Sequence, residues 1–199
     1  QAPEQGRGVQ LSLDVAIAAG GEAEWCQYMV LPGSGRLEIG KFEHKYSAGS
    51  HHMLLYQTNL SAADISSDKF ACAGASFTAL GVRGIAYGAQ VPDGDLVYPD
   101  GVALPLQGGD VVLLNAHYLN ASDKDLDAKV RLNLWYTQEP ATVEASTLFF
   151  YDWAILVPKD GTSQARMRCK IPSDIKLIFG QSHMHRRGVS YGAYLTGGD

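Results

Sequence analysis

Five of the six histidines in this chain occur at three positions: His51 and His52, His117, and His183 and His185. Each position lies in or at the end of an apolar run. A lone histidine in such a run is usually a hydrogen-bonded core residue, because imidazole is intermediate in its tendency to be buried. Imidazole is also the commonest metal ligand among side chains. Taken together, three such positions, two of them with paired imidazoles, favour a metal site.

The spacing of the last pair suits coordination. Side chains two residues apart on a strand share a face, so His183 and His185 project the same way, about 7 Å apart along the strand. Met184 then faces the opposite side and is expected to be a core residue. Gln181 shares the histidine face and is expected at the rim of the same site.

The other histidines place conditions on the fold. His51 and His52 are adjacent, so on a regular strand they would point apart. Both can reach one ion only at a strand end or a β-bulge, which residues 47–50 could supply. His117 lies in a buried run, where its ring nitrogens need partners. His44 belongs to no cluster and is expected to be a surface or strand histidine.

The type of metal is left open by the residues alone. Imidazole suits zinc, copper, iron and nickel. The carboxylates are expected in loops away from the histidines, so no pattern of two histidines and one carboxylate is evident. None of the three cysteines is spaced as C-x-x-C. An all-imidazole set of three is compatible with catalytic zinc or with copper.

Composition excludes several other functions. The net charge is −5 and the basic residues do not gather in one segment, which argues against nucleic acid and anionic membranes as partners. No apolar stretch approaches the roughly 20 residues of a membrane helix. The start at Gln1 has no initiator Met and looks like a processed or trimmed one, and we expect a secreted, periplasmic or secretory-pathway location. In such a protein, three cysteines suggest one disulfide and one leftover thiol.

Short alternating runs separated by turn residues predict an all-β fold without a convincing helix. We expect an antiparallel, jelly-roll-like β-sandwich. Glu139-Pro140 is the expected boundary between an N-terminal domain, residues 1–140, and the start of a second similar domain, residues 141–199. The expected strands include residues 9–18, 25–31, 37–46, 51–56, 102–106, 111–119 and 129–136, followed by 148–157, 164–171, 177–185 and 189–196.

Beyond these patterns, several motifs resemble the copper type II, ascorbate-dependent monooxygenases, the family of peptidylglycine alpha-hydroxylating monooxygenase and dopamine beta-hydroxylase. The similarity follows the family's order over most of residues 22–195. The matching stretches are Trp25-Cys26 to Leu31-Pro32, Ser50-His51-His52-Met53-Leu54-Leu55-Tyr56, Ile85-Ala86-Tyr87-Gly88, Pro99 to Val102, Asn115-Ala116-His117-Tyr118, and Cys169 to Gly188 around His183-Met184-His185.

The resemblance implies two packed β-sandwich domains with one mononuclear copper on each side of a solvent-filled cleft. It assigns His51, His52 and His117 to the electron-transfer copper. It assigns His183 and His185 to the oxygen-activating copper, whose third ligand in the family is a methionine further along than residue 199. The resemblance therefore implies that residues 141–199 are only the first part of the second domain, so the chain looks truncated.

The resemblance also pairs Cys26 with Cys72 in a disulfide. Cys169 matches a half-cystine whose partner lies further along in the family, so Cys169 is expected to be the leftover thiol. The family glutamine two residues before the His117 position is Asn115 here, which could still hydrogen-bond near the copper. Asn115 and Tyr118 are candidates to orient the imidazoles.

Departures from the family pattern bear on the substrate. Gln181 stands where the peptidylglycine enzyme has an arginine that binds the substrate carboxylate, so a peptide with a C-terminal glycine is not expected. Gln181 and Asn115 are candidate substrate contacts, and Arg186 and Arg187 could serve an anionic substrate. The expected activity is hydroxylation of a small organic substrate with O₂ and a reductant such as ascorbate.

Two other functions remain open at this point. One is a copper-binding module of the same fold without turnover. The other is a lectin-like or adhesive sandwich with incidental histidines, which predicts no stoichiometric copper.

Overall fold

The structure is a computed structural model that describes residues 1–152, 154–171, 173–185 and 187–196. Arg186 and part of the expected strand at 148–157 lie outside these ranges. The described residues contain β-strands and turns but no helix, which confirms the all-β prediction. No helix long and apolar enough to cross a membrane is present among them.

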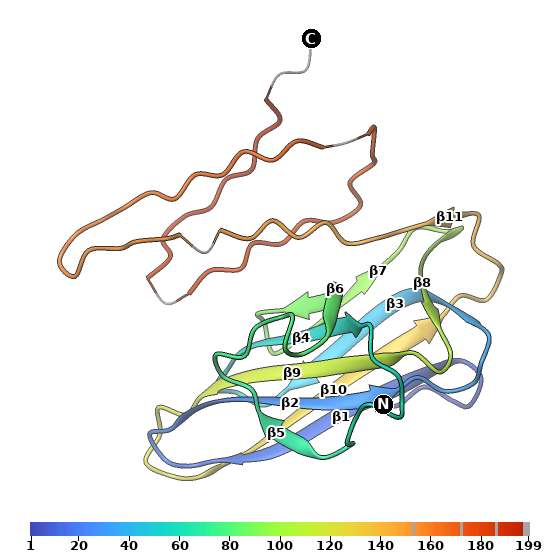
Figure 1. Ribbon diagram of the computed structural model, residues 1–199, viewed down its shortest axis with the longest axis horizontal. Helices are drawn as coiled ribbons and strands as arrows, with labels where there is room; N and C mark the ends of the chain where they lie inside the picture. Colours follow the sequence, from blue (N-terminus) through green and yellow to red (C-terminus); the bar gives the residue numbers. More distant parts are fainter. Residues whose placement is uncertain (153, 172, 186, 197–199) are drawn as a thin grey trace.

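The strands form two sheets (Figure 1). The first has the order β1 (Gly8–Ile17), β10 (Leu126–Tyr136), β3 (Arg36–Tyr46), β8 (Val102–Gln107) and β11 (Val143–Glu144), with β7 (Asp93–Val97) also paired to β3. The second has the order β5 (Lys69–Ala71), β2 (Glu22–Val30), β9 (Val111–Leu119), β4 (Ser50–Thr58) and β6 (Val82–Ala89). Every pairing is antiparallel except the two-residue contact of β11 with β8.

The main core lies between the two sheets. Alternate residues of β1, β3 and β10 pack against alternate residues of β4 and β9, as expected for a sandwich in which each strand buries one face. Tyr118 and Phe42 are the largest of the fully buried side chains. The alternation in residues 9–18, 37–46 and 129–136 therefore marks strands that face this core.

A second, smaller cluster covers the outer face of the five-stranded sheet. It contains Cys26, Tyr56, Cys72, Leu80 and Leu113. Cys26 of β2, Tyr56 of β4 and Leu113 of β9, which point away from the main core, are therefore covered by other parts of the chain. The candidate histidines of β4 and β9 lie on this same face.

The chain after β11 differs from expectation. The four segments predicted as strands there run as extended passes outside the sandwich (Figure 1), and their described residues carry no strand assignment. A strand is stabilised by a ladder of hydrogen bonds to a neighbour. Between described residues after Ala145, the only backbone hydrogen bond is from Gly188 N–H to the His185 carbonyl. The division into domains at residue 140 stays a prediction, and β11, beyond that boundary, belongs to the first sheet.

Candidate metal centre

The pairing register of β4 and β9 brings two of the candidate ligands together. His52 lies directly opposite His117, and their ring centroids are 5.2 Å apart. Met53 and Ala116, the next residues along each strand in that register, point into the main core instead. Because side chains alternate, both imidazoles project from the outer face.

A β-bulge adds His51 to the same group. The register between β4 and β9 shifts between Ser50 and His52, directly after Gly49, which has a φ of 90°. A bulge sets two consecutive residues against one on the partner strand. The His51 ring consequently lies 5.1 Å from that of His52 and 5.3 Å from that of His117. The requirement for a bulge or strand end, drawn from the adjacency of the two histidines, is confirmed.

His183 and His185 lie at least 66 residues beyond His117 in the sequence, yet their rings belong to the same group. The His185 and His183 rings lie 4.7 and 5.5 Å from that of His51, and His183 lies 4.9 Å from His52. The nitrogen atoms form two possible triads, each within 4.8 Å, namely His51 with His52 and His117, and His51 with His183 and His185. All five predicted ligands are therefore brought to one place.

His51 belongs to both triads. A neutral imidazole has one lone pair, so His51 can be a terminal ligand of only one ion at a time. The resemblance implies two coppers separated by a cleft. In this structure the H-x-H pair instead lies directly against the histidines of the sandwich, and the two triads compete for one ring.

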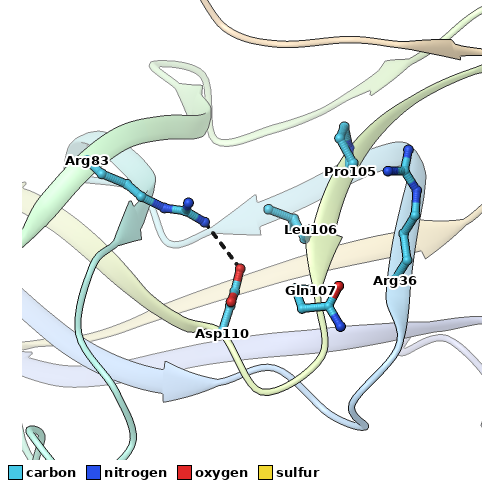
Figure 2. Close-up of a pocket in the computed structure, with 6 residues that line it drawn as sticks. All are labelled: Arg36, Arg83, Pro105, Leu106, Gln107 and Asp110. Carbon is cyan, nitrogen blue, oxygen red and sulfur yellow. Dashed lines mark hydrogen bonds and ion pairs between the residues drawn. The ribbon is translucent and has the colours of Figure 1, made fainter.

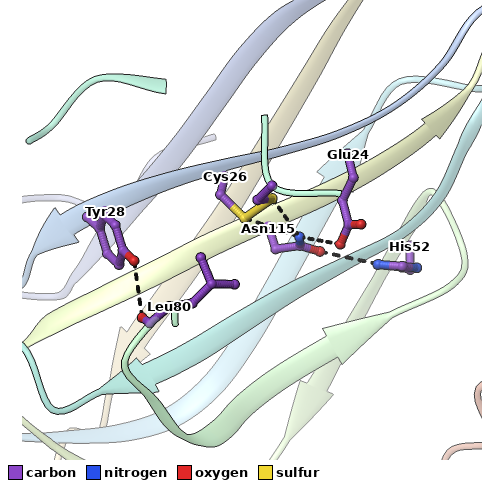
Figure 3. The surroundings of a disulfide bond; sticks show 7 residues. Glu24, Cys26, Tyr28, His52, Leu80 and Asn115 are labelled. Atoms are coloured by element: carbon purple, nitrogen blue, oxygen red, sulfur yellow. Dashed lines mark hydrogen bonds between the residues drawn. A yellow bond between two sulfur atoms is a disulfide. The ribbon is translucent and has the colours of Figure 1, made fainter. Parts of the chain in front are cut away.

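A buried hydrogen-bond chain determines the tautomer of His52 (Figure 3). Asn115 Nδ2 donates to Glu24 Oε1 at 2.8 Å, which directs Asn115 Oδ1 toward His52 Nε2 at 3.2 Å. Because an amide oxygen only accepts, His52 Nε2 carries the proton and Nδ1 keeps its lone pair. Asn115 therefore hydrogen-bonds to a candidate ligand, as expected, while the presence of copper there stays a prediction.

His117 is held in a similar way by Glu22, whose Oε1 lies 2.8 Å from His117 Nε2. The carboxylate accepts, so His117 Nε2 carries a proton, and in the neutral ring the lone pair lies on Nδ1. His52 Nδ1 and His51 Nε2 are both buried without a hydrogen-bond partner in the described part of the chain. Nearly all buried polar atoms in proteins are satisfied, so nitrogens of this kind in a cluster of imidazoles fit a metal ion.

The surroundings of His51, His52 and His183 lower the pKa of each ring, which favours its neutral form. Burial, first, and the neighbouring His183, His117 and His51 together lower the pKa of His52 to about 3, against an opposing effect of the hydrogen bond with Asn115. Although the residue is exposed as a whole, desolvation of the His183 ring against the other imidazoles, together with the nearby His185, lowers its pKa to about 4. The pKa of His51 is also lowered, mainly by burial. Neutral rings have lone pairs available, which is the form that binds metal.

Other residues singled out in the sequence occupy different surroundings. Asn115 is buried, and its amide is engaged as described, whereas Gln181 is exposed and forms no hydrogen bond to another described residue. Tyr118 does not orient an imidazole, since its side chain lies in the main core and its hydroxyl has no partner among the described residues. Arg187 donates to the Pro158 and Lys159 carbonyls.

The expectation for His44 is met only in part. It lies on β3, as a strand histidine, but it is 3% exposed and not at the surface. Its two ring nitrogens lie 2.8 Å from the Tyr87 hydroxyl and 2.8 Å from the Val91 carbonyl. With both nitrogens paired, His44 is a satisfied core histidine, in contrast to His51 and His52.

The assignment of all carboxylates to loops away from the histidines was wrong. Glu22 and Glu24 begin β2, and Glu24 lies opposite His117 in the register with β9. They share a face with Cys26 because all three are spaced by two. The spacing of two is visible in the sequence, but it predicts carboxylates near the histidines only once β2 is known to pair with β9.

The disulfide Cys26–Cys72 is present, with a Cα–Cα distance of 5.9 Å, as the resemblance implies. Its sulfurs lie 3.3 and 3.4 Å from Asn115 Nδ2 (Figure 3). Cys169 is exposed and unpaired within the described ranges, in agreement with the expected leftover thiol. The disulfide therefore borders the same hydrogen-bond chain that orients His52.

A cavity of about 310 Å³ lies elsewhere, lined by Arg36, Arg83, Gln107 and Asp110 among others (Figure 2). Arg83 pairs with Asp110 at 3.2 Å, and Arg36 pairs with Glu38 and Glu144 at 3.1 and 2.8 Å. The arginines are thus neutralised by carboxylates already, which makes this cavity a poor anion site. No histidine lines it.

The fold and the site together define a β-sandwich with a five-imidazole cluster on the outer face of one sheet. No known family model matches the chain, and no curated protein sequence matches it. The similarity to copper monooxygenases stays a prediction that depends on the motifs and on the geometry above.

Proposed function

We propose that this protein is a copper-dependent monooxygenase that hydroxylates a C–H bond of a small organic substrate, using O₂ and a reductant such as ascorbate. One observation carries the proposal. His51 and His52 have buried, unpartnered ring nitrogens, and both belong to a triad of imidazoles whose donor atoms lie within 4.8 Å of one another. A metal ion would accept the lone pairs of these nitrogens.

The donor set is compatible with copper, and the motif resemblance makes copper the preferred ion. Both triads consist of imidazoles, with no thiolate or carboxylate among the donor atoms. Imidazole donors suit copper and zinc alike. The order and spacing of the histidine motifs, which resemble the copper monooxygenases, make copper the preferred ion.

The chemistry requires one oxygen atom of O₂ to enter the substrate and the other to leave as water: R–H + O₂ + 2e⁻ + 2H⁺ gives R–OH + H₂O, with ascorbate oxidised to supply the electrons. Bound copper would supply one-electron redox chemistry and reaction with O₂. The chain would supply ligands from both triads, with Glu22 and Asn115 holding the rings of His117 and His52 in place.

Gln181 is the better of the two candidate substrate contacts. It is exposed on the segment that carries His183, whereas the amide of Asn115 is already hydrogen-bonded to Glu24 and His52. A neutral amide cannot form the paired charge contact that a carboxylate substrate needs. We therefore propose a substrate without a carboxylate at this position.

The disulfide bears on where the protein functions. Disulfides persist mainly in oxidising environments, and Cys26–Cys72 fits such a compartment. We propose a secreted, periplasmic or secretory-pathway protein. This location would also give access to O₂ and extracellular reductants.

Copper stoichiometry tests the proposal. The protein would be loaded with Cu(II), freed of excess metal and measured by plasma mass spectrometry, alongside His117→Ala and His183→Ala. We expect stoichiometric copper in the wild type and a loss in each variant, with His44→Gln as the non-ligand control. Hydroxylated product formed in proportion to O₂ consumed with ascorbate would establish turnover. Absence of stoichiometric copper would overturn the proposal.

A second candidate is a copper-binding protein without turnover. It is favoured by His51 completing the triad with His183 and His185, where the resemblance implies a methionine. A third imidazole in place of a thioether stabilises Cu(II) relative to Cu(I), since thioethers are the softer ligands. This function predicts copper retention without product formation under the same assay.

A further inference from the structure

Gln90 links the H-x-H segment to the sandwich. Its Nε2 donates to the Met184 carbonyl at 3.1 Å, and its Oε1 accepts from the Met184 N–H at 3.1 Å. Within the described part of the chain, no other hydrogen bond or ion pair joins residues beyond Ala145 to the sandwich. Ring contacts also join the two parts, between His183 or His185 and the histidines of β4 and between Tyr151 and Phe77, but Gln90 makes the only hydrogen-bonded link among the described residues.

The position of Gln90 follows from the register of β6. Ala89, the last residue of β6, pairs with Met53 on β4. In an antiparallel pair the chains run in opposite directions, so Gln90 follows Ala89 on the side where His52 precedes Met53. The glutamine is thus placed beside the histidines of β4, at the outer edge of the five-stranded sheet.

The side-chain amide of Gln90 acts as a substitute strand neighbour. An amide carries one carbonyl acceptor and an N–H donor, the same pair that a strand offers to a peptide unit. Met184 is the residue between the two histidines. Fixing both its N–H and its carbonyl orients its neighbours, whose side chains leave the segment on the face opposite that of Met184.

We propose that Gln90 is a positioning residue that docks the segment 183–185 against the sandwich, so that His51 can complete a triad with His183 and His185. The role of this docking in metal binding rests on the proposed function. The contact between Gln90 and the Met184 backbone is present without metal. Gln90 touches no candidate donor atom and acts only through the Met184 backbone.

Substitutions at Gln90 separate its two hydrogen bonds. Gln90→Ala removes both. Gln90→Glu keeps the acceptor for Met184 N–H but replaces the donor with a carboxylate oxygen facing the Met184 carbonyl, so one bond becomes a repulsion. Gln10→Ala is the matched control, because Gln10 Nε2 donates to Asn133 Oδ1 at 2.8 Å on the other sheet.

The first measurement is amide hydrogen exchange at Met184 by NMR, in metal-free protein. We expect protection in the wild type, exchange about 10- to 100-fold faster in Gln90→Ala, and unchanged exchange in Gln10→Ala. Gln90→Glu should give an intermediate rate. Unchanged exchange at Met184 in a folded Gln90→Ala protein, judged by circular dichroism, would overturn the proposal whatever the metal does.

The second measurement is Cu(II) titration followed by calorimetry. We expect Gln90→Ala to lower the Cu(II) affinity about 10- to 100-fold at the site that His183→Ala also weakens. The Cu(II) affinity of the site that depends on His117 should stay at its wild-type value. If the wild type binds no copper, the proposed function fails, and the exchange rate at Met184 still decides the docking role. If copper binds equally well to Gln90→Ala, the docking role in metal binding is wrong.

Discussion

Replacing Asn115 with alanine tests the link between the hydrogen-bond chain and the candidate ligands. Asn115 is 2% exposed, and its Oδ1 is the partner of His52 Nε2. In Asn115→Ala the His52 N–H would be left buried without an acceptor. A buried donor that loses its partner costs about 1–3 kcal/mol. Glu24, which also loses a partner, is only partly buried and can turn to water.

We therefore expect the free energy of unfolding of the metal-free protein to fall by about 2 kcal/mol, which is a drop in Tm of about 4–8 °C for a chain of this size. The freed ring can also rotate or change tautomer. Loss of the group that orients a ligand histidine typically weakens metal binding 10- to 100-fold. Thermal unfolding and calorimetric titration with Cu(II) measure the two effects separately.

Asn133→Ala is the control for this experiment. Asn133 is 4% exposed on β10, in the other sheet, and its Nδ2 donates to Glu43 Oε2 at 2.9 Å. It resembles Asn115 in burial and in its carboxylate partner but contacts no imidazole. We expect a similar loss of stability with unchanged copper affinity. Wild-type copper affinity in Asn115→Ala would refute the role assigned to the hydrogen-bond chain.

Three further outcomes are expected. His51→Ala should weaken copper binding more than either His117→Ala or His185→Ala, because His51 belongs to both triads; equal losses in a calorimetric titration would contradict the shared ring. The pKa of His52 lies at about 3 in the folded protein, below its usual value, so the unfolded chain binds an extra proton as the pH falls below about 6.5. His52 alone should accordingly contribute about 2 kcal/mol to the stability that the metal-free protein loses between pH 7.5 and pH 5 in urea unfolding, so His52→Gln should lose about that much less; the same pH dependence in both would rule this out. Cys26→Ser opens a loop of 46 residues and should cost about 4 kcal/mol in the same assay, so an unchanged midpoint would show that the disulfide does not stabilise the fold.

The sequence predicted the sandwich well because its strands bury one face each. In β1 and β10, for example, the hydrophobic residues recur with a period of two, and every second side chain packs into the main core. The same period failed after β11. Residues 164–171 alternate in a similar manner, but the described chain there has no hydrogen-bonded neighbour. A local hydrophobic pattern indicates which face of a segment can be buried, but it does not indicate which strand will pair with that segment.

The candidate ligands themselves were determined by the sequence: the residue types, the shared face of His183 and His185, and the need for a bulge at His51 follow from local geometry. What the tertiary structure alone decided is how these ligands meet. The register of β4 with β9 opposes His52 to His117, the pairing of β2 with β9 brings Glu22 to His117, and Gln90 docks the distant H-x-H segment. These contacts join residues more than 60 positions apart, and such pairings depend on the packing of the whole chain, which no short stretch of sequence encodes.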